Sequence, residues 1–89
     1  MNAQDIQTPQ GFNFIHRDDI NLGDEAIVHL YLDEDMDPLT LGYQPENGTV
    51  AKPWWFKCEF GPGSDGSFAT EEEMIAAVEN DYTDYLNNQ

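Results

Sequence analysis

Residues 26–32 read AIVHLYL, a run of β-branched and aromatic side chains with acidic residues on both sides. Such runs are typical of β-strands. Successive side chains of a strand point to opposite faces, and one face of this run is purely aliphatic: Val28, Leu30 and Leu32. We expect that face to cover a hydrophobic core, and the opposite face, which includes Tyr31, to be more accessible.

Two further strands are expected on the C-terminal side of this run. Residues 39–43 alternate in side-chain size and polarity and predict the returning strand. The Asn-Gly pair at 47–48 is typical of a hairpin turn and leads into a third strand within 49–60. One face of that strand is apolar: Trp54, Phe56, Cys58 and Phe60. A glycine-rich turn follows at 61–66.

The N-terminal part of the chain has weaker patterns. Residues 1–11 are polar and end in Thr-Pro-Gln-Gly, which indicates a flexible lead-in. Phe12 and Phe14 alternate with a polar residue and suggest a short strand at about 12–16, and 17–25 is expected to form a polar loop. We therefore expect one small domain over residues 12–89.

The last segment predicts a helix. Thr70 is followed three residues later by Glu73, the capping-box pattern of a helix start. An apolar stripe recurs at helical spacing: Met74, Ile75, Val78, Tyr82, Tyr85 and Leu86. The sequence as a whole therefore predicts an α+β fold, in which a three- or four-stranded antiparallel sheet has one C-terminal amphipathic helix packed on one face.

The charge of the chain is its most unusual property. Among 89 residues, 18 are Asp or Glu and three are Lys or Arg, and the formal net charge is −15. Small soluble domains commonly have net charges of magnitude roughly 2–8. Three cations are too few to neutralise a row of phosphates or anionic lipid headgroups, which excludes direct binding of nucleic acid and of an anionic membrane surface.

Location follows from signals that the chain lacks. No apolar run approaches the ~18 residues that cross a bilayer, and residues 1–7 do not resemble a secretory signal. A single cysteine, Cys58, cannot form an intramolecular disulfide. We expect a cytoplasmic protein, in the host cell if a phage encodes it.

An acidic segment at 33–37 invites comparison with a calcium loop. Asp33, Asp35 and Asp37 have the spacing of the first three ligands of an EF-hand. However, Pro38 stands where the loop needs glycine, and Gln44 stands where it needs the final glutamate. We therefore expect no dedicated calcium site.

Other chemical motifs are also missing. His16, His29 and Cys58 are single and lack the spacing of transition-metal ligands. The glycine-rich turn at 61–66 has no Walker lysine, and no nucleophile elbow surrounds the serines. We expect no metal, no cofactor and no enzymatic activity.

The charge is then the feature on which a function can rest. Carboxylates at i and i+2 of an extended segment lie roughly 6–7 Å apart, so rows of them approximate a phosphate track in spacing and sign. In size, charge and α+β architecture, the whole chain resembles the acidic DNA-mimic inhibitors encoded by phages and mobile elements, which include anti-CRISPR and anti-restriction proteins and inhibitors of uracil glycosylase. The resemblance implies inhibition by occupying the phosphate-binding groove of a host nucleic-acid-binding enzyme or defence complex.

The predicted partner-binding residues belong to the acidic turn, the outer face of the helix and the sheet face opposite the core. They are Asp33, Glu34, Asp35, Asp37, Glu72, Glu79, Asp84, Trp55 and Tyr31. Trp and Tyr are included because interface anchors are enriched in them. The expected partner is a nucleic-acid-binding protein with a basic groove, and the chain itself is expected to be a monomer or a homodimer.

Two other interpretations remain open. The chain could be an immunity protein or antitoxin that neutralises a basic nuclease, which differs from the mimic mainly in the partner. It could also be a small accessory protein of a halophile, whose acidity keeps the surface hydrated at high salt. The distribution of carboxylates discriminates, because halophilic charge is spread over the surface and a mimic concentrates charge on one face.

Overall fold

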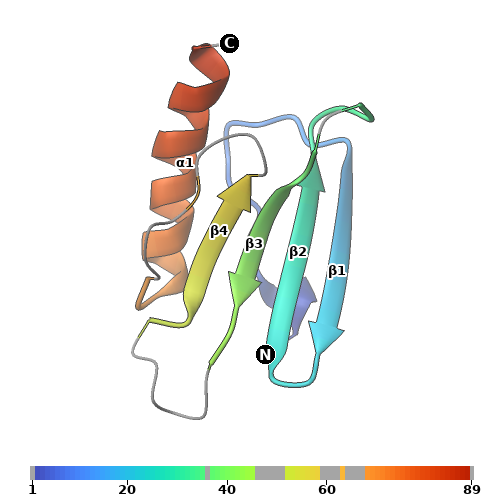
Figure 1. Cartoon of the computed structure of the whole chain (residues 1–89), viewed down its shortest axis with the longest axis vertical. Coiled ribbons are helices and arrows are strands. Elements are labelled where there is room, and N and C mark those ends of the chain that lie inside the picture. The colour runs from blue at the N-terminus through green and yellow to red at the C-terminus, as the bar shows by residue number, and fades with distance from the viewer. Residues whose placement is uncertain (1, 36, 46–51, 59–62, 64–67, 89) are drawn as a thin grey trace.

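The computed structural model describes residues 2–35, 37–45, 52–58, 63 and 68–88. Four antiparallel strands form one sheet in the order β1-β2-β3-β4, and a C-terminal helix packs against it (Figure 1). The predicted α+β arrangement is confirmed. The elements are η1 (Ala3–Asp5), β1 (His16–Leu22), β2 (Glu25–Tyr31), β3 (Leu39–Tyr43), β4 (Trp54–Cys58) and α1 (Glu71–Asn87).

The core lies between one face of the sheet and the helix. Val28 and Leu30 of β2 are buried, as the alternating pattern predicts, and so is Ala26, while Leu32 packs half-buried against the core. The register pairs Val28 with Leu41 and Leu41 with Phe56, so β3 and β4 present their apolar side chains to the same side. The buried side chains of these strands and of the helix form one cluster, in which burial of apolar area is the main stabilising term.

Helix α1 begins where its cap predicts. Thr70 has extended backbone angles (φ −130°, ψ 157°), and its hydroxyl accepts a hydrogen bond of 3.2 Å from the backbone N–H of Glu73. This bond satisfies one of the N–H groups that a helix start leaves without a partner. Met74, Val78 and Tyr82 are the buried residues of the helix and lie on the predicted apolar stripe.

The first strand is not where the sequence suggested. Phe12 and Phe14 are not in a strand; they pack half-buried against the core, while β1 occupies residues 16–22, which were expected to be mostly loop. A two-residue turn connects β1 to β2, with Gly23 at φ +66°, a conformation that glycine adopts without strain.

The N-terminal boundary also differs from the expectation. Residues 2–11, here called the N-terminal segment, were expected to precede the domain, but Ala3 and Ile6 are 0% and 1% exposed and belong to the core cluster. Packing of the domain therefore begins near residue 3, because η1 contacts β1 and β2 on the core side of the sheet.

The two outer strands of the sheet differ in their surroundings. Along the outer edge of β4, Trp54 and Phe68 exchange backbone hydrogen bonds of 3.1 and 2.6 Å. In the part of the chain that the structure describes, no segment pairs with the outer edge of β1. The expected turn at Asn47-Gly48, the ends of the strand expected within 49–60 and most of the turn at 61–66 lie outside the described residues; Gly63 is described and bridges to Lys57.

Candidate functional site

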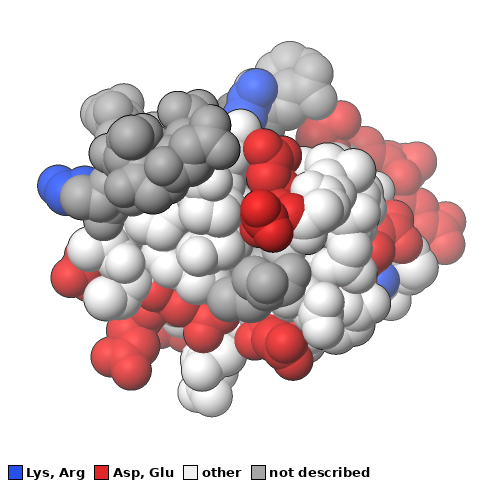
Figure 2. Space-filling model, turned by 90° about the horizontal axis from the view of Figure 1, so that it is seen from below, with Lys and Arg blue, Asp and Glu red and all other residues white. Residues whose placement is uncertain are grey.

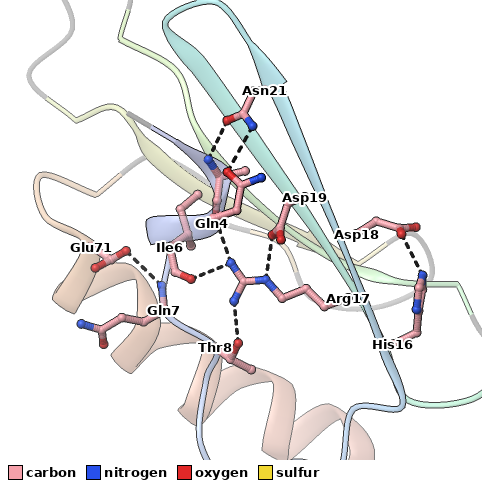
Figure 3. Close-up of polar contacts among 11 residues, drawn as sticks. Gln4, Ile6, Gln7, Thr8, His16, Arg17, Asp18, Asp19, Asn21 and Glu71 are labelled. Atoms are coloured by element: carbon pink, nitrogen blue, oxygen red, sulfur yellow. Dashed lines mark hydrogen bonds and ion pairs between the residues drawn. The ribbon is translucent and has the colours of Figure 1, made fainter.

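One of the three basic residues is committed to the interior of the fold. Arg17 points to the core side of β1, where its guanidinium donates to the carbonyl oxygens of Ala3 and Ile6, both at 2.8 Å (Figure 3). It also donates to Thr8 Oγ1 and to Asp19 Oδ1, both at 2.7 Å. Arg17 therefore anchors the N-terminal segment, and neutralises little of the acidic surface.

Other side chains complete this anchorage. Asn21 accepts a hydrogen bond of 2.7 Å from the backbone N–H of Ala3. From the helix, the carboxylates of Glu71 and Glu79 accept from the backbone N–H groups of Gln7 and Gln10 at 3.2 and 2.8 Å. The N-terminal segment is thus tied both to the sheet and to the helix.

The acidic turn between β2 and β3 presents its carboxylates to solvent. Asp33, Glu34 and Asp35 are exposed, and Asp37 is half-buried. Asp33 Oδ1 accepts a hydrogen bond of 3.0 Å from the backbone N–H of Asp35, the local bond that stabilises such turns. The turn lies at the end of the molecule where the helix finishes (Figure 1).

The three predicted helix residues are not equivalent. Glu72 and Asp84 are exposed, but Glu72 lies in the first turn of α1 and Asp84 in its last turn, at opposite ends of the molecule (Figure 1). Glu79 is half-buried and bonded to Gln10. Only Asp84 shares an end of the molecule with the acidic turn.

Trp55 lies on the sheet face away from the core, as its position in β4 predicts. Its ring covers Gly42 of β3 so closely that a Cβ on Gly42 would meet the ring within 2.1 Å. The indole Nε1 is buried, with no hydrogen-bond partner among the residues that the structure describes. Gly42 is therefore required by the close approach of the ring.

Tyr31 and Glu34 are brought together by the structure. With Ile15 and His16 they line a hollow of about 440 Å³, here called the Tyr31 hollow. The rings of Tyr31 and His16 are 5.5 Å apart, since the two residues pair across β1 and β2. His16 and Ile15 were missed as site residues because their position depends on a strand that the sequence did not predict.

The face of the sheet opposite the helix carries little net charge. It includes two carboxylates, Asp18 and Glu25, together with Lys57, and Asp18 contacts His16 Nε2 at 2.7 Å. His16 and Asp18 point away from Arg17 and Asp19, which lie on the other side of β1 (Figure 3). Most of the described carboxylates therefore lie on the turns, the helix and the N-terminal segment.

The described carboxylates fall into several groups. Figure 2, which views the end where α1 begins, shows acidic side chains in more than one place, with uncharged described residues between some of them. The acidic turn and Asp84 lie at the opposite end of a molecule 39 Å long, on different elements. The predicted partner-binding residues Glu72 and those of the acidic turn are therefore at opposite ends, and their role in binding stays a prediction.

Within residues 2–35, 37–45, 52–58, 63 and 68–88, no three His, Cys, Asp or Glu side chains gather as they would around a metal ion. No helix of the described chain is long and apolar enough to cross a bilayer.

One tyrosine has a shifted acidity. Burial of the side chain, with smaller contributions from the nearby Cys58 and Tyr85, raises the pKa of Tyr82 to about 12. Tyr82 is 1% exposed and packs on Phe12 and Tyr85, with ring centroids 5.5 and 5.9 Å away. This shift follows from core packing, because burial disfavours the charged phenolate.

The chain matches no family model, no curated protein and no solved structure. A function must therefore be argued from the charge and geometry described above.

Proposed function

We propose that this chain is an acidic inhibitor that occupies the phosphate-binding groove of a nucleic-acid-binding protein. The observation that carries the proposal is the net charge of −15 together with the internal use of Arg17. Of the three cations, only Lys52 and Lys57 are exposed to offset the carboxylates. A field of this sign attracts cationic grooves and repels nucleic acids, and it speeds association in a salt-dependent manner.

The contact region in this proposal is the end of the molecule that holds the acidic turn. Asp33, Glu34 and Asp35 are adjacent, exposed and supported by a local hydrogen bond. Asp84 adds a carboxylate from the last turn of the helix. Arg and Lys side chains that grip phosphates form charge-assisted hydrogen bonds with carboxylates equally well. Each exposed pair contributes only ~0–1 kcal/mol, so several must act together.

A second function is favoured by the separate acidic groups in Figure 2. Carboxylates distributed over several surfaces suit a protein whose charge maintains hydration at high salt. In that case no groove-binding partner exists, and the stability of the isolated domain depends strongly on salt because screening reduces repulsion between like charges.

The test begins with retention of bacterial lysate proteins on the immobilised chain at low and moderate salt, followed by elution with duplex DNA. Each eluted protein is then purified, and its binding to a fluorescent duplex is measured by anisotropy with increasing amounts of the inhibitor. The proposal expects competitive displacement of the duplex. If no retained protein loses its duplex when the inhibitor is added, the proposal is wrong.

Two variants with equal charge separate a specific surface from general acidity. One carries Asp33→Asn, Glu34→Gln and Asp35→Asn in the acidic turn. The other carries Asp24→Asn, Glu72→Gln and Glu73→Gln, three exposed residues at the opposite end. Each changes the net charge from −15 to −12, by three carboxylates. We expect the first to weaken inhibition at least about tenfold more than the second; equal losses would contradict the assignment of the acidic turn.

A further inference from the structure

The Tyr31 hollow combines three kinds of surface in one place. Its volume of about 440 Å³ falls in the ~300–1,000 Å³ range of small-ligand sites. Tyr31 and His16 provide aromatic rings, Ile15 provides an aliphatic side chain that is 58% exposed, and Glu34 provides a carboxylate from the acidic turn.

The charge around the hollow has one sign. Glu34 lines it, and the adjacent Asp33 and Asp35 are exposed in the same turn. No Lys or Arg is among the described residues that line it, and the guanidinium of Arg17 is directed to the other side of β1 (Figure 3). The charge of this site therefore favours a cationic ligand.

The aromatic rings narrow the choice of cation. A guanidinium is planar, stacks on aromatic faces and forms paired hydrogen bonds with a carboxylate, whereas an ammonium is a compact and strongly hydrated charge. The methylene groups of an arginine side chain also suit contact with an exposed aliphatic residue such as Ile15.

We infer that the Tyr31 hollow accepts an arginine side chain from the basic partner protein. In this arrangement the guanidinium stacks on Tyr31 and pairs with Glu34, while the aliphatic part of the side chain packs on Ile15. The inference rests on the proposed function, which supplies a partner rich in arginine, and it adds a specific anchor to an otherwise general electrostatic attraction.

A second hollow on the same face of the sheet is lined by a cation instead of a carboxylate. It measures about 280 Å³ and is lined by His29, Pro38, Thr40 and Lys57, with His29 Nδ1 at 2.9 Å from Thr40 Oγ1. Lys57 repels a cation there, so an arginine that approaches this end of the sheet is directed to the side of β1 and β2.

The experiment uses a blocked tripeptide, N-acetyl-Gly-Arg-Gly-amide, titrated into the full chain and followed by ¹H–¹⁵N NMR. The control peptides replace arginine by citrulline, its uncharged isostere, or by lysine. We expect binding in the millimolar range, which suits one side chain, with the largest shifts at Ile15, His16, Tyr31 and Glu34. Citrulline should bind at least about tenfold more weakly, and lysine also more weakly.

Matched variants test the site. Glu34→Gln and Tyr31→Leu should each weaken binding of the arginine peptide about five- to tenfold. Asp24→Asn removes the same charge from the opposite end and should change binding less than about twofold. Glu34 is exposed in a turn, so its variant keeps the test valid even if Tyr31→Leu fails to fold.

Each outcome separates this inference from the proposed function. Equal losses in Glu34→Gln and Asp24→Asn, or shifts spread over all acidic segments, would overturn the arginine site. If the peptide does not bind in the hollow while the chain still displaces duplex from its partner, the inference fails and the proposed function stands. If the peptide binds as expected but no retained protein loses its duplex, the proposed function fails and the cation site stands.

Discussion

Replacement of Arg17 by methionine tests the largest polar network in the described structure. The variant keeps most of the aliphatic stem but removes four hydrogen bonds, to Ala3 O, Ile6 O, Thr8 Oγ1 and Asp19 Oδ1. It removes the guanidinium donor from two backbone carbonyls of the N-terminal segment, of which Ala3 O keeps its bond from the Ile6 N–H. It also leaves the Asp19 carboxylate, whose side chain is 25% exposed, without its cation.

The expected cost follows from these contacts. Loss of each partly buried bond from the charged guanidinium to a carbonyl costs about 1 kcal/mol. The partly exposed ion pair with Asp19 adds ~0–1 kcal/mol. We expect Arg17→Met to lower the free energy of unfolding by about 2–3 kcal/mol, which for a domain of this size lowers the melting temperature by roughly 10–20 °C.

The measurement is urea unfolding followed by tryptophan fluorescence, with Lys52→Met as the control. Lys52 is exposed, and its replacement makes the net charge −16, as Arg17→Met does, so general repulsion is matched. Hydrogen exchange adds a local readout, because the amides of Asp5 and Ile6, bonded to Asn2 O and Ala3 O, should lose protection. A difference below about 0.5 kcal/mol between the two variants would refute the anchoring role of Arg17.

Three further predictions concern the sheet, the helix and the core. Gly42→Ala should destabilise the domain by about 1–3 kcal/mol in urea unfolding, because its Cβ meets the Trp55 ring. In a Trp55→Leu background the cost should largely disappear, and an unchanged cost there would exclude the ring as its cause. Thr70→Ala should cost about 1 kcal/mol through loss of the bond from Glu73 N, whereas Thr70→Ser should retain it; thermal unfolding compares the two, and equal melting temperatures would count against the cap. The pKa of Tyr82 is raised to about 12 from its ordinary 10.0. The contribution of the buried neutral Tyr82 to folding stability is therefore complete below pH 10 and is lost as the pH rises through 12. The ultraviolet titration of the tyrosines should lose its most alkaline step in Tyr82→Phe, and an unaltered titration would contradict the shift.

The elements predicted correctly are those whose pattern depends on their own residues. The alternation in β2 and the apolar stripe of α1 indicate which side chains face a core, whatever that core contains. Thr70 marks the helix start through a bond to a residue three positions away. Such local signals need no knowledge of the rest of the fold.

The errors involve polar side chains that are satisfied by distant parts of the chain. Arg17, Asp19 and Asn21 point inward in β1, where a strand next to a core is expected to carry apolar residues. Their partners lie in the N-terminal segment, which looks like a flexible lead-in until those bonds are known. The turn at Gly23-Asp24 was the one local signal for this hairpin, because a glycine-acid pair between strands favours a tight turn.

Only the part of the candidate site that depends on local sequence was predicted. The exposure of Asp33, Glu34 and Asp35 follows from their position in a turn between two strands. The meeting of Tyr31 and Glu34 in one hollow requires the path of the chain after β2, and the presence of His16 beside them requires the pairing of β1 with β2. Spacing in the sequence cannot supply either.

The polar character of β1 has a consequence for how copies of this protein behave when crowded. An unpaired strand edge can recruit other chains and start the growth of fibres. Here the described residues of that edge strand include Arg17, Asp18 and Asp19, and stacking identical copies would place like charges beside one another at the spacing of neighbouring strands, about 4.8 Å. The charged residues that made β1 hard to recognise as a strand thus also disfavour polymerisation through its free edge.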